Sequence, residues 1–317
     1  MWQERQAELL REEIEALLAA LPGTANFHGL LKEPLTKARR GLSADVVQTQ
    51  PWPLLPLMVC EAVSGRYEHV LPAAASLQFL MAAGDVFDDI EDADSAESLS
   101  ARYGPALAVN AATALLVLAQ KALAQLKGRG VAGGLVVRAM DVVNSFYITA
   151  CAGQHVDLSL ASEMATSEEQ YLRIIEMKSA SQMECACHIG ALLAPAAQDV
   201  VDTFGLFGHN LGMAAQITND VQGIIKGSDI LKQKITLPVI YALAQTDGEA
   251  HHQMELAFSK QAGPPSDMAS VRDLLYHAGA IHYAIIKAEL YRQQASDVLC
   301  KAEAAGASTE KLKLFLG

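Results

Sequence analysis

The chain has 317 residues, of which 51% are hydrophobic and 19% charged, enough for one large buried core or two domains. Its 24 lysines and arginines stand against 36 aspartates and glutamates, which gives a net charge of −12. This acidity argues against nucleic acid as a partner, because phosphate backbones require a basic surface, but an anionic small molecule can still bind through metal ions.

The composition predicts an almost entirely helical chain. Alanine and leucine dominate, and alternating strand patterns are hard to find. In chain order, helices are expected at 2–21, about 72–94, about 105–126, 131–161, 167–193, 197–226, 236–245, 249–260 and 267–304. Before the second of these, Pro51, Pro53 and Pro56 mark a polar stretch. No linker or repeat divides the chain, so we expect one domain over 1–317, with 1–34 as an N-terminal helix and lead-in.

Hydropathy and charge spacing predict a cytoplasmic protein without a membrane span. The mean hydropathy of +0.18 is high for a soluble protein and indicates extensively buried helices. The most apolar stretch, 106–119, is interrupted by Asn110 and Thr113 and is shorter than the roughly 20 apolar residues that a span needs. Charges at helical spacing in 1–21 argue against a signal peptide.

The five cysteines form no disulfide framework in a chain of this length. Cys185, Cys187 and His188 are close enough in sequence to suggest a metal site. Residues two apart on a helix point to different faces, however, and no second cluster completes a tetrahedron. We therefore expect these three to be ordinary buried residues.

The strongest functional signal lies in 84–92, which reads GDVFDDIED. At 3.6 residues per turn, four carboxylates share one helix face, namely Asp85, Asp88, Asp89 and Asp92. These carboxylates repel one another and oppose the helix dipole, so a merely solvated helix end leaves the pattern unexplained. The preceding residues are nearly all apolar. An acidic face beside an apolar helix predicts a site for hard cations such as Mg²⁺, completed by phosphate oxygens and water.

A second set of side-chain oxygens is expected on the helix at 197–226. Gln216, Asn219, Asp220 and Gly223 fall on one face by the same spacing, and only Asp220 is charged. This face is a weaker candidate for metal binding, through Asn219 and Asp220. A polar surface is the competing interpretation.

Together these segments resemble the polyprenyl synthetase family, the trans-isoprenyl diphosphate synthases. The matching segments are 88–92 (DDIED, the first DDxxD motif), 153–157 (GQHVD, the GQxxD segment), 178–180 (KSA, the lysine motif), 216–223 (QITNDVQG, where the second DDxxD is expected) and 227–238 (GSDILKQKITLP, the GSD and K-x-TLP sequences). These five motifs occur in the family order, and the resemblance spans about 35–300. It implies an all-α class I isoprenoid synthase helical bundle around a central apolar pocket, and a homodimer.

Three departures from the family pattern concern the acceptor. The N-terminal GGKR is reduced to KARRG at 37–41, no arginine pair occurs in 93–101, and the second motif keeps one of its three aspartates. The shortened loop and the following LAVNAATALL resemble the divergent branch of ComQ-type enzymes, which prenylate a tryptophan in a peptide pheromone. Asn219 and Asp220 also resemble the start of the NSE motif of class I terpene synthases, although Gly223 and Gly227 stand at its later positions.

The resemblance implies Mg²⁺-assisted departure of diphosphate from an allylic isoprenyl diphosphate. The implied ligands of two or three Mg²⁺ ions, with diphosphate bound, are Asp88, Asp89, Asp92, Asn219 and Asp220. The implied diphosphate ligands are Lys178, Gln216, Lys226, Lys234, Arg39 and Arg40, and the implied catalytic residues are Asp88, Asp89 and Lys178. The expected pocket residues are Leu80, Ala83, Gly84, Phe87 and Gln154. Because Ala83 and Gly84 are small, the pocket is expected to be deep enough for fifteen carbons or more.

Three fates of the resulting carbocation are open. Prenyl transfer to an acceptor, either isopentenyl diphosphate or a non-phosphorylated nucleophile, is the favoured hypothesis. The alternative is intramolecular cyclisation or elimination, as in a terpene synthase. A third hypothesis is a non-catalytic partner subunit of a prenyl synthase, but the intact first motif speaks against it, because an inactive subunit has no need of a repulsive acidic face.

Overall fold

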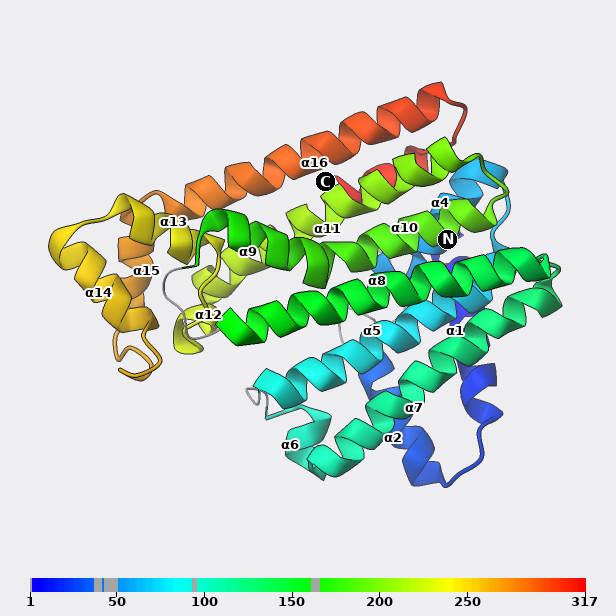
Figure 1. The fold of residues 1–317 in the computed structure, drawn as a ribbon, viewed down its shortest axis with the longest axis horizontal. Coiled ribbons are helices and arrows are strands. Elements are labelled where there is room, and N and C mark those ends of the chain that lie inside the picture. Colours follow the sequence, from blue (N-terminus) through cyan, green and yellow to red (C-terminus); the bar gives the residue numbers. More distant parts are fainter. Residues whose placement is uncertain (1, 37–41, 43–50, 93–95, 161–165) are drawn as a thin grey trace.

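The computed structural model describes residues 2–36, 42, 51–92, 96–160 and 166–317, and within these ranges it contains helices and no strands (Figure 1). The α-helices are α1 (Trp2–Ala19), α2 (Ala25–Leu35), α4 (Leu55–Ser64), α5 (Leu71–Asp92), α6 (Leu99–Tyr103), α7 (Pro105–Ala124), α8 (Gly133–Leu160), α9 (Glu168–Ile175), α10 (Ser181–Leu193), α11 (Gln198–Lys226), α12 (Ser228–Leu231), α13 (Leu237–Gln245), α14 (Gly248–Phe258), α15 (Met268–His277) and α16 (Ala280–Ala304). The 3₁₀ turns are η1 (Trp52–Leu54), η2 (Glu68–Val70), η3 (Gln125–Arg129) and η5 (Glu310–Phe315), and a π-helical turn, η4 (Glu176–Ala180), joins α9 to α10. The predicted all-helical fold is confirmed.

Long helices running side by side form the body of the molecule (Figure 1). α11 packs along α10 and α16, and α5 packs along α7. One buried core surrounds Phe79 of α5 and Phe207 of α11. A second core surrounds Ile224 of α11, Phe258 and Leu275. The helices α11 and α16 contribute to both cores and so connect them.

The predicted long helices agree with the structure with three main differences, and the short helices α6 and α12 were also not predicted. The proline-containing stretch is not a polar connection but forms η1 and the buried helix α4, with Pro53 and Pro56 in first turns, where no backbone donor is needed. The helix α2 was not predicted; the Thr24 side chain caps its N-terminus. The single helix predicted at 267–304 is wrong, because Gly279, with φ of +75°, separates α15 from α16.

Three helical segments are long and apolar enough to cross a membrane by length and composition, namely 68–92, 105–129 and 133–160. The predicted absence of a membrane span is therefore not confirmed. Of the apolar window in the α5 segment, 78% is buried inside the bundle, whereas only 17% of the window in α8 is buried. α7 and α8 consequently present an apolar outer face, on which Val117, Val137 and Ile148 are exposed.

Candidate active site

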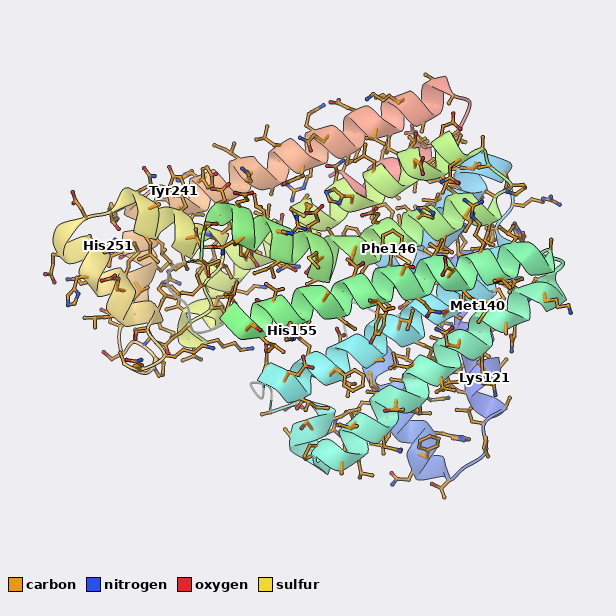
Figure 2. All side chains as sticks on the ribbon, viewed as in Figure 1. Lys121, Met140, Phe146, His155, Tyr241 and His251 are labelled. Atoms are coloured by element: carbon orange, nitrogen blue, oxygen red, sulfur yellow. The ribbon has the colours of Figure 1, made fainter. Side chains whose placement is uncertain are left out.

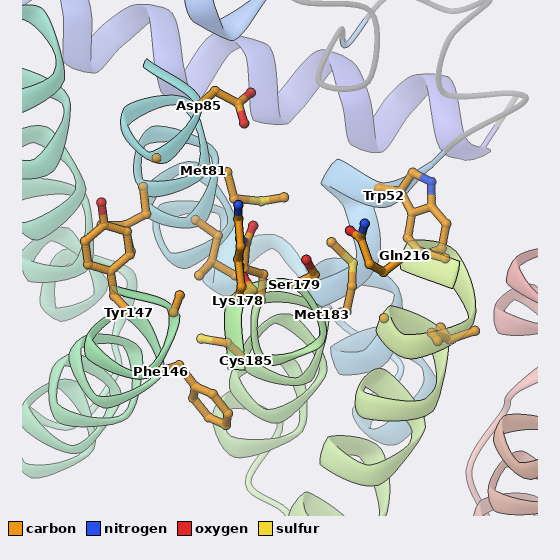
Figure 3. Close-up of a pocket in the computed structure, with 18 of the residues that line it drawn as sticks. Trp52, Met81, Asp85, Phe146, Tyr147, Lys178, Ser179, Met183, Cys185 and Gln216 are labelled. Atoms are coloured by element: carbon orange, nitrogen blue, oxygen red, sulfur yellow. The ribbon is translucent and has the colours of Figure 1, made fainter. Parts of the chain in front are cut away.

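A cavity of about 960 Å³ lies between α5, α8, α10 and α11 (Figure 3). Its volume is within the range of roughly 300–1,000 Å³ that is usual for small-molecule sites. The apolar side chains that line it include Leu77, Leu80, Met81, Leu116, Val143, Phe146, Met183 and Leu211. The polar side chains that line it include Asp85, Asp88, Glu91, Gln154, Lys178, Gln216, Asn219 and Arg292. The cavity therefore combines an apolar interior with a charged region.

α5 supplies both the apolar wall and the acidic end of this cavity. Leu77, Leu80, Gly84, Asp88 and Glu91 line it at spacings of three or four residues, which is one stripe of an α-helix. The stripe becomes charged only in the last turns of the helix. The order of residues along α5 thus places the carboxylates at one end of an apolar pocket.

Lys178 neutralises the acidic end of the cavity. Its Nζ lies 3.1 Å from Oδ1 of Asp88 and 2.8 Å from Oδ2 of Asp157. Burial alone would lower the pKa of the Lys178 ammonium, but Asp157 and Asp88 outweigh burial and raise this pKa above its usual value. The lysine therefore stays charged and joins α5 to α8 by two ion pairs.

The position of Lys178 depends on the π-helical turn η4 and on Gly153 of α8. π-Helical turns are rare and often mark functional sites. A Cβ atom on Gly153 would lie 2.6 Å from the backbone nitrogen of Lys178 and 2.8 Å from Cβ of Met177. Only glycine permits so close an approach of α8 to η4. The approach lets Gln154 donate hydrogen bonds from Nε2 to Asp88, at 3.0 Å, and to Glu91, at 2.8 Å.

A second lysine contacts the same acidic end from a distant part of the chain. Nζ of Lys234, which follows α12, lies 3.0 Å from Oδ2 of Asp92. This ion pair ties the C-terminal end of α5 to the segment beyond α11. The structure thus places Lys178 and Lys234 at the same acidic end of the cavity, which the composition alone did not predict.

The second oxygen cluster on α11 is only partly directed into the cavity. Gln216 and Asn219 line the cavity, but the side chain of Asp220 is buried. The Tyr171 hydroxyl hydrogen-bonds to Asp220, and Nε2 of Gln216 donates to its other oxygen at 2.9 Å. Burial, and then the negative charges of Asp229 and Asp157, raise the pKa of Asp220 well above its usual value.

The remaining predicted site residues fall in different places. Leu80, Gly84 and Phe87 line the cavity, and Asp89 is half-buried next to Asp88 in the chain. Ala83 is fully buried and is not among the lining residues, because its side chain lies on another side of α5. Lys226 is exposed at the end of α11. Arg39 and Arg40 lie outside the described residues.

Several lining residues were not among the predicted site residues. Trp52 and Phe315 come from opposite ends of the chain, and their ring centroids lie 4.9 Å apart. Such a long-range contact leaves no local sequence signal. Asp157 did carry a sequence signal, because it ends the GQHVD segment. Its ion pair with Lys178 shows that this segment helps to hold the lysine at the acidic end of the cavity.

Cys185 and Cys187 are buried and all five cysteines are free. His188 packs edge-on against Phe146, with ring centroids 5.8 Å apart. Figure 2 shows Phe146 projecting from α8 toward α10. Cys187 is buried, Cys185 is buried and also lines the cavity, and His188 is half-buried against Phe146, so the expectation of burial holds for the two cysteines but not for His188.

The donor atoms at the acidic end fit a Mg²⁺–diphosphate complex better than a bare ion. Among the described residues, no group of three or more His, Cys, Asp and Glu side chains is arranged to hold a metal ion. Asp88 and Asp92 offer hard carboxylate oxygens, and Oε1 of Gln154 is buried without a hydrogen-bond partner in the described part of the chain. Mg²⁺ is typically bound by one or two carboxylates together with substrate phosphates and waters, which these residues can accommodate.

Known proteins resemble this chain in sequence, and solved structures resemble it in fold. The polyprenyl synthetase model matches residues 52–275. The chain is 26% identical over 275 residues to the geranylfarnesyl diphosphate synthase of Aeropyrum pernix, covering 82% of this chain and 85% of that enzyme. It is 27% identical over 238 residues to the tryptophan prenyltransferase ComQ of Bacillus spizizenii, covering 74% and 81%. The crystal structure of a geranylgeranyl pyrophosphate synthetase from Pyrococcus horikoshii matches with a TM-score of 0.84 at 24% identity, over 99% of this chain and 96% of that one, which shows the shared fold.

Proposed function

The chain belongs to the polyprenyl synthetase family and is a prenyltransferase of that family, and on this premise we propose that it ionises an allylic isoprenyl diphosphate at the acidic end of the cavity. The observation that carries the proposal is the position of Lys178, which pairs with Asp88 and Asp157 where the apolar cavity meets the carboxylates. A diphosphate bound there would meet cationic side chains at its oxygens, while its hydrocarbon chain would extend along α5 into the apolar part.

In this proposal, Mg²⁺ when bound would neutralise the leaving diphosphate as charge develops on it. Asp88, Asp89 and Asp92 would hold the metal ions, with Asn219 and Asp220 as weaker ligands. Lys178 pairs with Asp88, and Lys234 pairs with Asp92. If Mg²⁺ bound these carboxylates, both lysines would be close enough to contact the phosphate oxygens instead. Arg39, Arg40, Gln216 and Lys226 are proposed as further diphosphate contacts.

The walls of the cavity would protect the cation from water. Leu80, Phe146, Tyr147 and Met183 line the space beyond the carboxylates. A dry, apolar surface prevents hydrolysis of a reactive cation. The cavity volume of about 960 Å³ supports a substrate of fifteen carbons or more.

The acceptor of the prenyl group is tested by product analysis. The purified protein is incubated with farnesyl or geranylgeranyl diphosphate and Mg²⁺, with and without isopentenyl diphosphate. Longer diphosphates formed only with isopentenyl diphosphate would identify chain elongation. Hydrocarbons or alcohols formed without it would identify cyclisation or elimination, and copurification with an active synthase in the absence of activity alone would identify a partner subunit.

A homodimer located in the cytoplasm completes the proposal. The exposed apolar residues of α7 and α8, among them Val117, Val137 and Ile148, support the homodimer, because a second copy of the chain would cover them. Light scattering of the wild-type protein should give twice the mass of one chain. The double variant Val137→Glu/Ile148→Glu should be a monomer. The control variant Leu256→Glu, on the distant α14, should remain a dimer. A wild-type monomer would contradict the dimer, and recovery of the protein in the membrane fraction would contradict the location.

A further inference from the structure

Two aromatic rings form part of the cavity wall away from the apolar stripe of α5. Trp52, at the start of η1, and Phe315, in η5, both line the cavity, and their ring centroids lie 4.9 Å apart with the ring planes at 48°. In the view of Figure 3, Trp52 lies on the same side of Lys178 as Gln216, whereas Tyr147 lies on the other side. The aromatic pair therefore lies on the side of the cavity to which α11 brings a polar side chain.

The turn η5, which follows α16, is anchored so that Phe315 keeps this place. Leu312 is fully buried, and Phe315 is only 8% exposed. Nζ of Lys311 lies 2.7 Å from Oε1 of Glu61 on α4 and 4.6 Å from the ring centroid of Trp2 on α1. The turn cannot move away from the cavity without breaking this ion pair and exposing apolar side chains to water.

An aromatic wall at this place matters because water can capture a prenyl cation. In that side reaction the bond from C1 to the diphosphate oxygen breaks, a new bond forms from C1 to the oxygen of water, and the proton that water loses passes to the diphosphate. The products are a prenyl alcohol and pyrophosphate. Bulky apolar side chains at the reacting end exclude water from the cation. Trp52 and Phe315 supply such side chains on the side of the cavity where Gln216 lies.

We propose that the pair of Trp52 and Phe315 determines the fate of the prenyl cation by keeping water away from the reacting end of the cavity. This inference rests on the proposed function. The pair differs in role from the α5 stripe, because the stripe contacts the hydrocarbon chain, whereas the pair controls what the cation reacts with. Loss of the pair should consequently change the products without changing the preferred chain length.

The first test follows oxygen from water into the product. The wild type and Phe315→Ala are incubated with farnesyl diphosphate, isopentenyl diphosphate and Mg²⁺ in ¹⁸O-labelled water. Capture of the cation labels the alcohol, whereas hydrolysis at phosphorus leaves the alcohol unlabelled. Phe315→Ala should form about tenfold more labelled alcohol per pyrophosphate released than the wild type, because the wall no longer keeps the cation dry. Phe315→Leu, which keeps a bulky apolar side chain, should restore the wild-type ratio, and Leu316→Ala, beside the cavity wall but not lining it, should match the wild type.

The outcomes separate this inference from the proposed function. An unchanged ratio in Phe315→Ala, with pyrophosphate still released, would overturn the role of the aromatic pair alone. A wild type that already forms mostly labelled alcohol would also overturn it, because its wall would not exclude water. A wild type that releases no pyrophosphate would contradict the proposed function, and the inference with it.

A second measurement tests the wall without catalysis. The chain has two tryptophans, so a Trp2→Phe background leaves Trp52 as the fluorescent residue, and acrylamide quenching measures its access to solvent. Adding Phe315→Ala should raise the quenching constant about twofold or more, because the ring that packs against Trp52 is lost. Adding Leu316→Ala should leave the constant unchanged. Equal quenching in the two variants would show that Phe315 does not cover Trp52 and would contradict the inference.

Discussion

Gly153→Ala tests whether the close approach of α8 to the π-helical turn builds the site. The added Cβ would meet the Lys178 nitrogen at 2.6 Å, Cβ of Met177 at 2.8 Å and the Met177 carbonyl carbon at 2.9 Å. Two of these atoms belong to the backbone, so no side-chain rotation relieves the contact. Overpacking of this kind costs about 1–3 kcal/mol, and we expect the upper end. Replacing a helical glycine by alanine gains roughly 1 kcal/mol, which leaves a net loss of about 2 kcal/mol.

Gly134→Ala is the matched control on the same helix. No atom lies within 4 Å of the Cβ that it adds, so this variant should be about 0.5 kcal/mol more stable than the wild type. Urea denaturation followed by circular dichroism measures both changes. Gly153→Ala should also lose about a hundredfold in turnover, because a displaced α8 moves Gln154 and Asp157 away from their partners. Equal stability of the two variants would refute the packing argument.

Three further predictions follow from the contacts of single side chains. Gly84 lines the cavity with open space around it, so Gly84→Leu should shorten the preferred substrate in a competition between allylic diphosphates, and an unchanged chain preference would contradict this. Ala83 is buried in the core instead, so Ala83→Phe should lower the free energy of unfolding by about 1–3 kcal/mol. Lys178→Met should lower the rate of diphosphate release by about a hundredfold or more, and a wild-type rate would remove the lysine from the mechanism. The hydrogen bond that the His209 ring donates to Glu184 raises the pKa of His209 above its usual value of about 6.5. This pair therefore stabilises the fold below the usual pKa and loses its contribution as the pH rises through the folded-state pKa. Glu184→Gln should therefore cost a few tenths to about 1 kcal/mol at pH 6 and little at pH 9, and an equal cost at both would contradict the charge.

The sequence predicts much of this fold because the helices carry strong periodic signals. The boundaries of α5, α7, α8 and α11 agree with the expected ranges within about two residues. The break at Gly279 was missed because a single glycine within a polar helical pattern does not by itself end a helix. The helix α4 was missed because the prolines at 51, 53 and 56 were read as a break, although Pro56 stands in the first turn of the helix.

The site residues were likewise predicted where the signal lies within one helix and missed where contacts join separate elements. Spacing on one helix correctly places Asp88 at the end of an apolar wall, since this relation depends only on α5. It does not distinguish Ala83 from Gly84, because neighbouring residues on a helix point in different directions and the sequence does not state which faces the cavity. The pairing of Lys234 with Asp92 and the approach of Asp229 to Gly223 require the tertiary fold, because the partners come from separate elements.

The most direct test of the central claim is the rate of pyrophosphate release from farnesyl and geranylgeranyl diphosphate, with isopentenyl diphosphate present and absent, in the wild type and in Asp88→Asn. We predict Mg²⁺-dependent release by the wild type and a rate at least about a hundredfold lower in Asp88→Asn, with the fold intact by circular dichroism. Equal release by the two proteins, or release that does not depend on Mg²⁺, would contradict the proposal that this chain ionises its substrate at the acidic end of the α5 cavity.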